Sequence, residues 1–372
     1  FWPLLILAAL AFPMTFYAHR GLTRFVLSGR EGADITDVVE QHFGKKAGAL
    51  ITLLYFFAVF PILLIYSVAL TNTVGSFLEH QLHIQPPPRA LLAFVLIVGL
   101  LAVVRCGEQI IVKAMSLMVY PFIVALLFLA VFLIPHWTGG ILSTASSVPA
   151  PSAFVHTLWL AIPVMVFSFN HSPIISAFAV DQKRQYGEQA ERRSSQILAR
   201  AHLLMVVMVL FFVFSCVLTL SPEQLAEAKA QNLSILSYLA NHFSNPTIAF
   251  AAPLIAFVAI TKSFLGHYIG ASEGLKGLVV KTGRRPSPRT LDRLTAGFML
   301  VVCWLVATLN PSILGMIETL GGPVIAALLF LMPMYAVRNV PAMRQYAGKA
   351  SNVFVVALGL VSISALVYSL LP

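Results

Sequence analysis

The sequence predicts an all-α protein that crosses a membrane many times. Of its 372 residues, 59% are hydrophobic and only 10% are charged, and the mean hydropathy is +0.87. Water-soluble domains contain about 25% charged residues. A helix needs about 20 consecutive apolar residues to span the bilayer core, whereas a β-barrel shows alternating segments of about ten. The long apolar runs of this chain are of the helical kind.

The apolar runs define ten candidate spans. They lie at residues 2–18, 49–78, 90–104, 110–134, 154–180, 202–220, 248–271, 294–309, 312–336 and 352–371. Of the 24 Lys and Arg residues, 21 fall in alternate loops, and only Arg89 and Lys229 fall in the opposite loops. The rich loops are 19–46, 105–113, 181–200, 272–293 and 337–351. Because cytoplasmic loops carry an excess of Lys and Arg, these loops are predicted to be cytoplasmic.

The net charge of +10 is spread over these loops and does not form one clustered basic face. Nucleic-acid binding requires such a face, so no nucleic acid partner is expected. The three cysteines lack metal-ligand or disulfide spacing, so they are interpreted as packing residues, and no metal or other cofactor is expected.

The predicted orientation places Phe1 on the outer side of the membrane. The chain opens on Phe1-Trp2-Pro3, without a Met, a charged segment or a cleavage site that could direct it across. We therefore expect at least one further helix before Phe1, which would give eleven spans and a cytoplasmic N-terminus.

The span at 154–180 contains the signal for a broken helix. Pro173 removes a backbone donor and clashes with the preceding turn, so unwinding is predicted over residues 167–173. Exposed backbone at this depth survives only where it faces protein or a polar cavity, and interrupted helices bind charged substrates in one class of transporter. A proline kink healed by local hydrogen bonds is the alternative. The candidate substrate-binding residues are Phe167, Ser168, Phe169, Asn170, His171 and Ser172.

Lys262 is a basic residue inside the span at 248–271, about eight residues from its predicted inner end. An intramembrane charge costs at least about 3 kcal/mol, so the group finds a partner or loses its proton. Both outcomes suit proton coupling, and a structural ion pair is the alternative. Thr261 and Ser263 flank it, and His267 lies one turn further in, as a hydrogen-bonded interior residue or a relay.

Glu318 is the only acidic residue well inside a span, and we expect it to be buried. Gly321-Gly322-Pro323 follows and weakens the helix, which indicates a hinge. A gate or proton carrier and a structural hydrogen bond are equally compatible with Glu318.

Two polar regions allow a structural and a functional interpretation. The outer amphipathic segment from Leu225 to Phe243 is either a surface connector or a lid over an outward vestibule. The sparse polar face of the second span is more typical of a helix seam than of a ligand wall; it comprises Tyr55, Tyr66, Ser67, Thr71 and Asn72.

Six segments resemble the hydroxy and aromatic amino acid permease family. They are residues 11–20, 61–67, 166–176, 234–243, 261–268 and 309–323. The similarity runs along the whole chain and is to the serine/threonine branch, closest to its bacterial proton-coupled serine permeases.

The resemblance implies one transmembrane transporter domain, residues 1–372, with the LeuT-like inverted-repeat fold of the amino acid–polyamine–organocation superfamily. Residues 1–134 would be helices two to five, 154–336 the second repeat, and 352–371 the eleventh helix. Ten helices of the expected eleven are then present, and the family's Gly-rich broken first helix is absent from this sequence.

The function implied is uptake of L-serine, with L-threonine as a further substrate, by proton symport across the bacterial inner membrane. A threonine or aromatic amino acid permease of the same fold is the alternative. Within this reading, Lys262 takes the place of a sodium ion against the first helix. No obligate protein partner is evident. An intramembrane enzyme lacks a recognisable motif here, and a channel would show repeated filter sequences.

Overall fold

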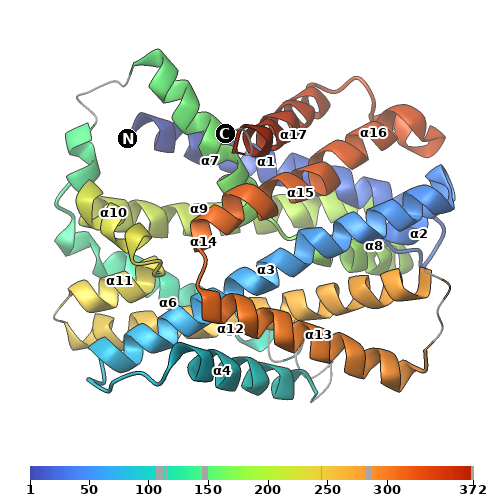
Figure 1. The fold of residues 1–372 in the computed structure, drawn as a ribbon. Helices are drawn as coiled ribbons and strands as arrows, with labels where there is room; N and C mark the ends of the chain where they lie inside the picture. Colours follow the sequence, from blue (N-terminus) through green and yellow to red (C-terminus); the bar gives the residue numbers. More distant parts are fainter. Residues whose placement is uncertain are drawn as a thin grey trace.

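The computed structural model describes residues 1–105, 113, 116–144, 150–243, 245–281, 283 and 286–369. Every regular element in these ranges is a helix, and long helices run side by side through the molecule (Figure 1). The predicted all-α fold is confirmed for the described residues.

Ten helical segments follow the predicted spans. They are α1 (Trp2–Leu27), α3 (Lys45–His80), α4 (Arg89–Val104), α6 (Val119–Phe132), α7 (Pro151–Ser168) with α8 (Ser172–Tyr186), α9 (Ala190–Thr219), α12 (Pro246–Lys281), α13 (Pro288–Leu309), α14 (Ile313–Met316) through α16 (Met332–Asn339), and α17 (Ala350–Ser369). Between α14 and α16 lie the π-helical turns η4 (Ile317–Gly321) and η5 (Ala326–Leu331), with α15 (Gly322–Ile325) between them.

Shorter elements connect these helices. They are α2 (Ile35–Phe43), α10 (Pro222–Ala230), α11 (Ile235–His242) and the 3-10 turns η1 (Ile134–His136), η2 (Gly140–Thr144), η3 (Gly187–Gln189) and η6 (Pro341–Tyr346). Asp34 sets the start of α2 because its carboxylate accepts the amides of Thr36 and Asp37. Ser221 and Gln224 start α10 with a reciprocal capping box.

Several helices are longer than the apolar runs that predicted them. Helix α1 continues to Leu27 and α12 to Lys281, so parts of the predicted loops 19–46 and 272–293 are helical. Polar residues extend these helices beyond the bilayer core, where hydropathy no longer marks them. The first part of the predicted span 110–134 and the loop 105–113, including Cys106, lie largely outside the described residues.

By length and composition, eight described helical stretches could cross a membrane, and α4 and α17 are shorter apolar helices. That criterion joins α8 and α9 into one stretch, Ser172–Thr219. The chain reverses between them, however, because Gly187 has a φ of +51° and the two helices pack against each other. We therefore treat α7 with α8 as one broken span and α9 as the next.

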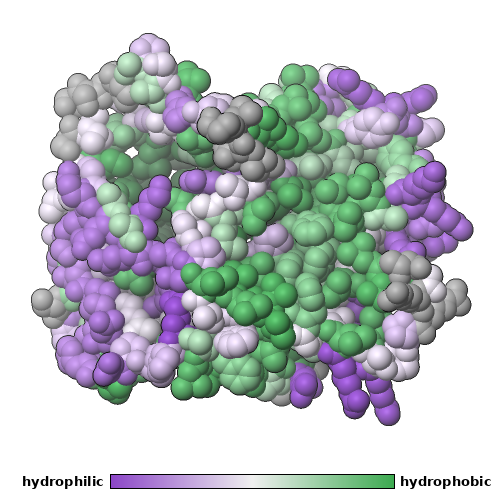
Figure 2. Space-filling model, viewed as in Figure 1, coloured by the Kyte–Doolittle hydropathy of each residue, from purple (hydrophilic) through white to green (hydrophobic). Residues whose placement is uncertain are grey.

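The surface agrees with a membrane protein. Figure 2 shows a hydrophobic band across the middle of the visible face, with hydrophilic residues concentrated at its two ends. One end carries α2 and the junctions of α8 with α9 and of α12 with α13; we call it the basic side. The opposite end carries α10 and α11 and is called the outer side.

Two separate hydrophobic cores hold the helices together. The first core is built from α1, α2, α7, α8, α9, the stretch from α15 to α16, and α17. The second core is built mainly from α3, α4, α6, α11, α12 and α13. Helix α3 contributes Ala58 and Ile62 to the first core and Leu63 and Leu70 to the second. Helix α9 likewise contributes Val206 to the first core and Cys216 to the second. The protein is thus two packed bodies that share the long helices α3 and α9.

Helix α7 lies unusually close to the segment that contains Gly321 and Gly322. A Cβ at Gly321 would lie 2.5 Å from the ring of Phe167, and one at Gly322 would lie 2.5 Å from the carbonyl oxygen of Pro163. Only residues without side chains permit this approach. Gly321-Gly322-Pro323 was predicted to weaken the helix, and two π-helical turns, η4 and η5, lie there on either side of α15.

We expect Gly322→Ala to destabilise the protein by about 1–3 kcal/mol, because the new methyl group meets rigid backbone of α7. Gly297→Ala is the matched control, since a Cβ at Gly297 on α13 meets nothing within 4 Å. The thermal unfolding midpoint in detergent checks this. Equal midpoints for the two variants would contradict the close contact.

Candidate functional site

The broken span forms as predicted. Helix α7 ends at Ser168 and α8 begins at Ser172, so three residues, 169–171, lie outside helix. We call these three residues the break. The amide of Phe169 donates to Met165 O at 3.1 Å, and that of Asn170 donates to Phe167 O at 3.1 Å. The last turn of α7 is therefore closed by its own backbone.

The start of α8 is satisfied by the chain itself. Asn170 Oδ1 accepts the amide of Ser172 at 3.0 Å, Pro173 has no amide hydrogen, and the amide of Ile174 donates to His171 O at 3.1 Å. Asn170 thus acts as a local cap, while no partner of its side-chain nitrogen is found among the described residues. The side chain retains one hydrogen-bond donor for another group.

The other predicted site residues differ in accessibility. Ser168 is exposed, and its hydroxyl donates to Val164 O at 2.7 Å. Phe169 and Ser172 are buried, and Phe167 is half-buried against Gly321. Ser168 and Asn170 therefore offer the accessible polar groups of this segment.

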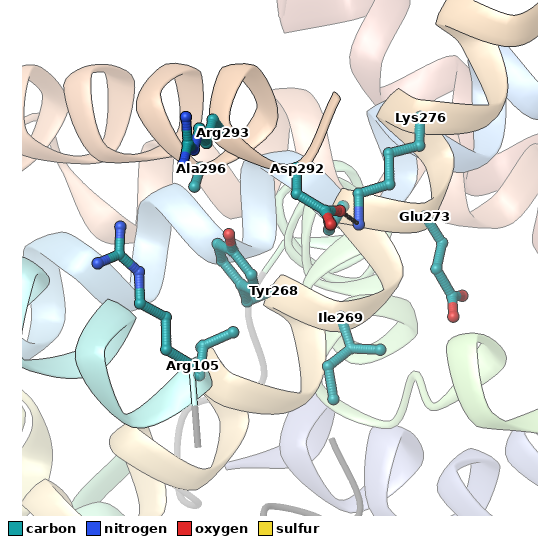
Figure 3. Close-up of a pocket in the computed structure, with 10 residues that line it drawn as sticks. Arg105, Tyr268, Ile269, Glu273, Lys276, Asp292, Arg293 and Ala296 are labelled. Atoms are coloured by element: carbon teal, nitrogen blue, oxygen red, sulfur yellow. Dashed lines mark ion pairs between the residues drawn. The ribbon is translucent and has the colours of Figure 1, made fainter. Parts of the chain in front are cut away.

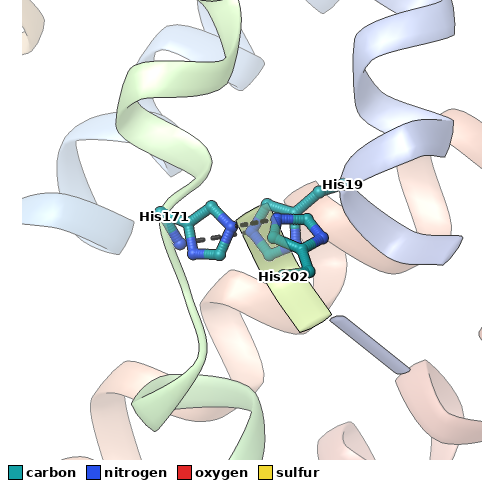
Figure 4. Close-up of side chains that lie close together, drawn as sticks. All are labelled: His19, His171 and His202. Carbon is teal, nitrogen blue, oxygen red and sulfur yellow. Dashed lines mark hydrogen bonds between the residues drawn. The ribbon is translucent and has the colours of Figure 1, made fainter. Parts of the chain in front are cut away.

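Three histidines meet at the break, as Figure 4 shows. The backbone amide of His171 donates to Nε2 of His19 on α1 at 3.2 Å, and the two rings stack with centroids 3.8 Å apart. Nε2 of His171 lies 2.5 Å from Nε2 of His202 on α9. We call His19, His171 and His202 the histidine cluster. It joins the break to the two neighbouring helices.

The sequence reasoning identified His171 but missed His19 and His202. His19 directly follows the predicted span 2–18, and His202 is the first residue of the span 202–220, so both were placed at a membrane boundary. The longer helices α1 and α9 place both residues in helix interiors, where they are 1% and 2% exposed. The sequence did contain a signal for the cluster: His19 and His202 each lie at the end of a predicted span, and His171 lies at the predicted break.

Lys262 lies near the middle of α12, because that helix continues to Lys281. Its side chain is half-buried, and no hydrogen bond or ion pair of its ammonium is found among the described residues. The neighbouring Thr261 hydroxyl is buried without a partner. His267 Nδ1 donates to Ser263 O at 2.8 Å, which is a local helix contact.

The structure does not bring Lys262 to the break. The residue of α12 that approaches the break is Gly270, whose added Cβ would lie 4.0 Å from Pro173. Lys262 is eight residues from Gly270, which is about 12 Å along a helix. Lys262 and the break are therefore two separate sites. Lys262 lies on α12, which packs in the second core, and the break lies between α7 and α8, which pack in the first core.

The expectation that Glu318 is buried is wrong. Glu318 lies in the π-helical turn η4, close to the outer end of its span, and its side chain is half-buried. The predicted span began at residue 312, and the helix begins at Ile313, so Glu318 is only about one and a half turns inside it.

A cavity of about 600 Å³ opens between α2, α3, α8 and α12 on the basic side. Its lining includes Pro173 and Ser176 of α8, Tyr55 of α3, and Glu273 and Lys281 of α12. Pro173 lies two residues beyond the break, so this cavity extends from the basic side to the first turn of α8 without being lined by the break itself.

A second cavity, of about 410 Å³, lies between α4, α12 and α13, and Figure 3 shows it. It contains Arg105, Tyr268 and the ion pair of Lys276 with Asp292, whose atoms are 2.5 Å apart. No residue of the break lines this cavity. We therefore place no substrate site there.

Three asparagines close the outer side. Asn72 Nδ2 of α3 donates to Asn232 O at 2.8 Å and to Asn310 Oδ1 at 3.2 Å. Asn232 Nδ2 donates to Asn310 Oδ1 and to Pro311 O, and its Oδ1 accepts the amide of Ile313 at 2.9 Å. We call Asn72, Asn232 and Asn310 the outer asparagine cluster. It ties the segment between α10 and α11 to α3 and to the junction of α13 with α14.

This arrangement favours the lid interpretation of the outer segment over the connector. Ser237 and Asn241 of α11 add hydrogen bonds to Thr73 and Ser76 of α3. Within the segment, Tyr238 donates to Glu227 at 2.7 Å, and burial together with this carboxylate raises the pKa of Tyr238 to about 12. The outer segment is thus bonded to α3, while the cavity on the basic side extends to Pro173 of α8.

The apolar helical segments and the interrupted span fit a multi-pass membrane transporter. The model of the tryptophan/tyrosine permease family matches residues 1–368, and the chain belongs to that family.

Two relatives illustrate the similarity. The Serine transporter SdaC of Escherichia coli (strain K12) is 64% identical over 376 residues, which cover 99% of this chain and 88% of the relative. The Threonine/serine transporter TdcC of Yersinia enterocolitica is 44% identical over 393 residues, covering 99% of this chain and 89% of the relative. The protein is therefore a multi-pass inner-membrane transporter and not an enzyme.

We expect Asn232→Gly to open the outer side. Glycine keeps the left-handed backbone at this position, where φ is +55°, but removes three side-chain hydrogen bonds. At about 1 kcal/mol each, their loss shifts the closed–open equilibrium by tenfold or more. The readout is the labelling rate from outside of Thr71→Cys, in a background with the native cysteines replaced. Thr71 is buried on α3 and lines, with Asn72 and Asn310, a cavity of about 380 Å³ on the outer side.

The control for this experiment is Gln231→Ala, which removes only a bond to Glu227 within α10. Labelling that is no faster in Asn232→Gly than in this control would rule out a gating role for the outer asparagine cluster.

Proposed function

We propose that this protein carries L-serine into the cell by proton symport. The observation that supports this most strongly is the 64% identity, along 99% of the chain, to a relative named a serine transporter. The relative named for threonine and serine is 44% identical, which favours serine as the main substrate and threonine as a further one. An aromatic amino acid is the alternative, since the family is named for tryptophan and tyrosine.

The proposed substrate site is the segment from Phe167 to Ser172. The carbonyl end of α7 has a partial negative charge that suits the substrate ammonium, and the amino end of α8 suits the carboxylate. The side-chain nitrogen of Asn170 is the proposed partner of the serine hydroxyl, together with His171. A site that bonds this hydroxyl rejects alanine, because the site's polar group would be left unpaired.

Alternating access follows from the two-body architecture in this proposal. The first core contains the broken span, and the second core contains most of α3 and α12. Rocking of the first core against the second would close the cavity on the basic side, which lies between α2 and α8 of the first core and α3 and α12 of the second. The assignment of residues 1–134 and 154–336 to inverted repeats, with 352–371 as an added helix, belongs to the same proposal.

The direct test is uptake of radiolabelled L-serine into liposomes that contain the purified protein. We expect accumulation when the outside is more acidic, no requirement for sodium, and strong competition by unlabelled serine and threonine but not by tyrosine. Uptake that needs sodium would overturn proton symport, and competition by tyrosine alone would overturn the proposed substrate.

Lys262, with Thr261, Ser263 and His267 around it, is proposed to replace a sodium ion between α12 and the first helix that the resemblance implies. Its protonated form would bond carbonyls of that helix, and its neutral form would release them. We expect Lys262→Met to lose pH-driven accumulation by tenfold or more while it retains exchange of internal for external serine. Lys229→Met, an exposed lysine of α10, is the control.

Glu318 is the other proposed coupling or gating residue, and Glu318→Gln tests it in the same assay. A change in the pH dependence of uptake would support coupling. An unchanged rate and an unchanged pH dependence would leave Glu318 a structural residue of η4.

A further inference from the structure

The histidine cluster joins three separate helical elements at the point where the membrane span is interrupted. His19 comes from α1, His202 from α9, and His171 from the break between α7 and α8. One ring nitrogen from each of the three histidines lies within 4.8 Å of those of the other two (Figure 4). His19 and His202 are almost completely buried, so bulk water does not supply their hydrogen bonds.

The bonds of His19 fix its protonation state. Nδ1 lies 2.7 Å from the carbonyl oxygen of Thr15, and a carbonyl only accepts, so Nδ1 carries a hydrogen. Nε2 lies 3.2 Å from the backbone nitrogen of His171, and an amide only donates, so Nε2 carries a lone pair. His19 is therefore neutral in this arrangement. Its lone pair holds the backbone of the break against α1.

The two remaining histidines share one proton. Their Nε2 atoms are 2.5 Å apart, a distance that requires one nitrogen to donate and the other to accept. Nδ1 of His202 is buried, and no partner for it is found among the described residues. In the tautomer in which Nε2 of His202 donates to His171, this Nδ1 carries a lone pair that can take up a proton.

A metal ion fits this geometry poorly. Imidazole nitrogens bind Zn²⁺ at about 2.0–2.1 Å in a tetrahedron, which keeps two ligand nitrogens more than about 3 Å apart. The Nε2 atoms of His171 and His202 are closer than that. The rings of His19 and His171 are stacked with an interplanar angle of 9°, so their lone pairs lie in parallel planes and do not converge on one point.

We propose that the histidine cluster binds the transported proton and uses it to release the break from α1. This inference rests on the proposed proton symport and adds a proton-binding site distinct from Lys262. The proton enters from the outer solution and leaves on the basic side. When it is bound at Nε2 of His19, that nitrogen no longer accepts the amide of His171, so the hydrogen bond between α1 and the break is lost.

The surroundings contain no described carboxylate that would neutralise the added charge. On α1, Arg20 stacks on Phe16 and Tyr17, and Arg24 pairs with Glu191 of α9 at 2.6 Å. On α8, Asp181 pairs with Arg184, and Lys183 donates to the carbonyls of Leu27 and Gly29. The remaining charged or titratable groups of α7, η3 and α9 are exposed; they are His156, Glu188, Arg192, Arg193 and Arg200. An imidazolium here is unpaired, and its new N–H at Nε2 faces the N–H of His171, which leaves that backbone amide without its acceptor.

The test uses His202→Gln, because the glutamine amide can still donate to His171 but cannot take up a proton. Calorimetric serine binding in two buffers of different ionisation enthalpy gives the number of protons bound with the substrate. We expect about one proton for the wild type and close to none for His202→Gln. In His202→Gln, pH-driven accumulation should fall at least about tenfold relative to the gradient-free serine exchange of the same variant.

Two further variants make the result specific. His156→Gln, an exposed histidine at the start of α7, should bind protons as the wild type does. His19→Gln keeps an oxygen that can accept the amide of His171 and should lose proton uptake, as His202→Gln does. These variants keep the inference testable if His202→Gln does not fold.

Three results would overturn the inference. Full proton uptake in His202→Gln and His19→Gln, with loss in Lys262→Met, would place the coupled proton at Lys262 alone. One equivalent of Zn²⁺ retained by the wild type after dialysis and lost in His202→Gln would make the cluster a metal site. A wild type that accumulates serine without any response to pH would refute proton symport itself, independently of the histidines.

Discussion

Backbone hydrogen bonds at bilayer depth are the constraint on which the rest of this structure depends. Water cannot satisfy an unpaired amide there, so each group released by an interrupted helix must find a partner in the protein. The amide of Ser172 is bound by Asn170, and the amide of His171 is bound by His19. The first partner is local, but the second comes from another helix. The conformation of the break therefore depends on where α1 lies.

The break and α1, on whose position its conformation depends, belong to one of two hydrophobic cores. Side chains within each core interpenetrate, whereas α3 and α9 contribute residues to both cores. The outer asparagine cluster joins elements of the second core, and Gly321 and Gly322 bring their segment against α7 within the first. The cavity on the basic side, in contrast, lies between helices of different cores.

Much of the fold was predictable from the sequence, because hydropathy and the distribution of Lys and Arg report directly on the bilayer. Hydropathy predicted the ten spans, whereas the polar residues before Pro173 predicted unwinding over residues 167–173, which the structure shows at residues 169–171. The ends of the helices were not predicted, because a helix can continue through polar residues after its apolar run has ended. The last turns of α12 are an example. That error placed His19 and His202 at span boundaries and concealed the histidine cluster.

The candidate site was predictable only where the residues that indicate it are neighbours in the sequence. Four polar residues before Pro173 marked the break, but the meeting of α1, α8 and α9 is a tertiary contact that no local pattern encodes. For Glu318, a local pattern predicted burial that the structure does not show. A single acid within an apolar run suggested burial, whereas the distance from the helix start leaves it half-buried near the outer end.

The shared helix α3 also bears on how the protein is made. It packs along α12, and Lys281 of α12 donates to Thr52 of α3 across 229 residues of sequence. At about 5–20 residues per second, a ribosome needs on the order of tens of seconds to synthesise that interval. During this time α3 has entered the bilayer without its main partner. The first core's helices from α7 to α9 are inserted meanwhile, so the second core is completed only when α12 arrives.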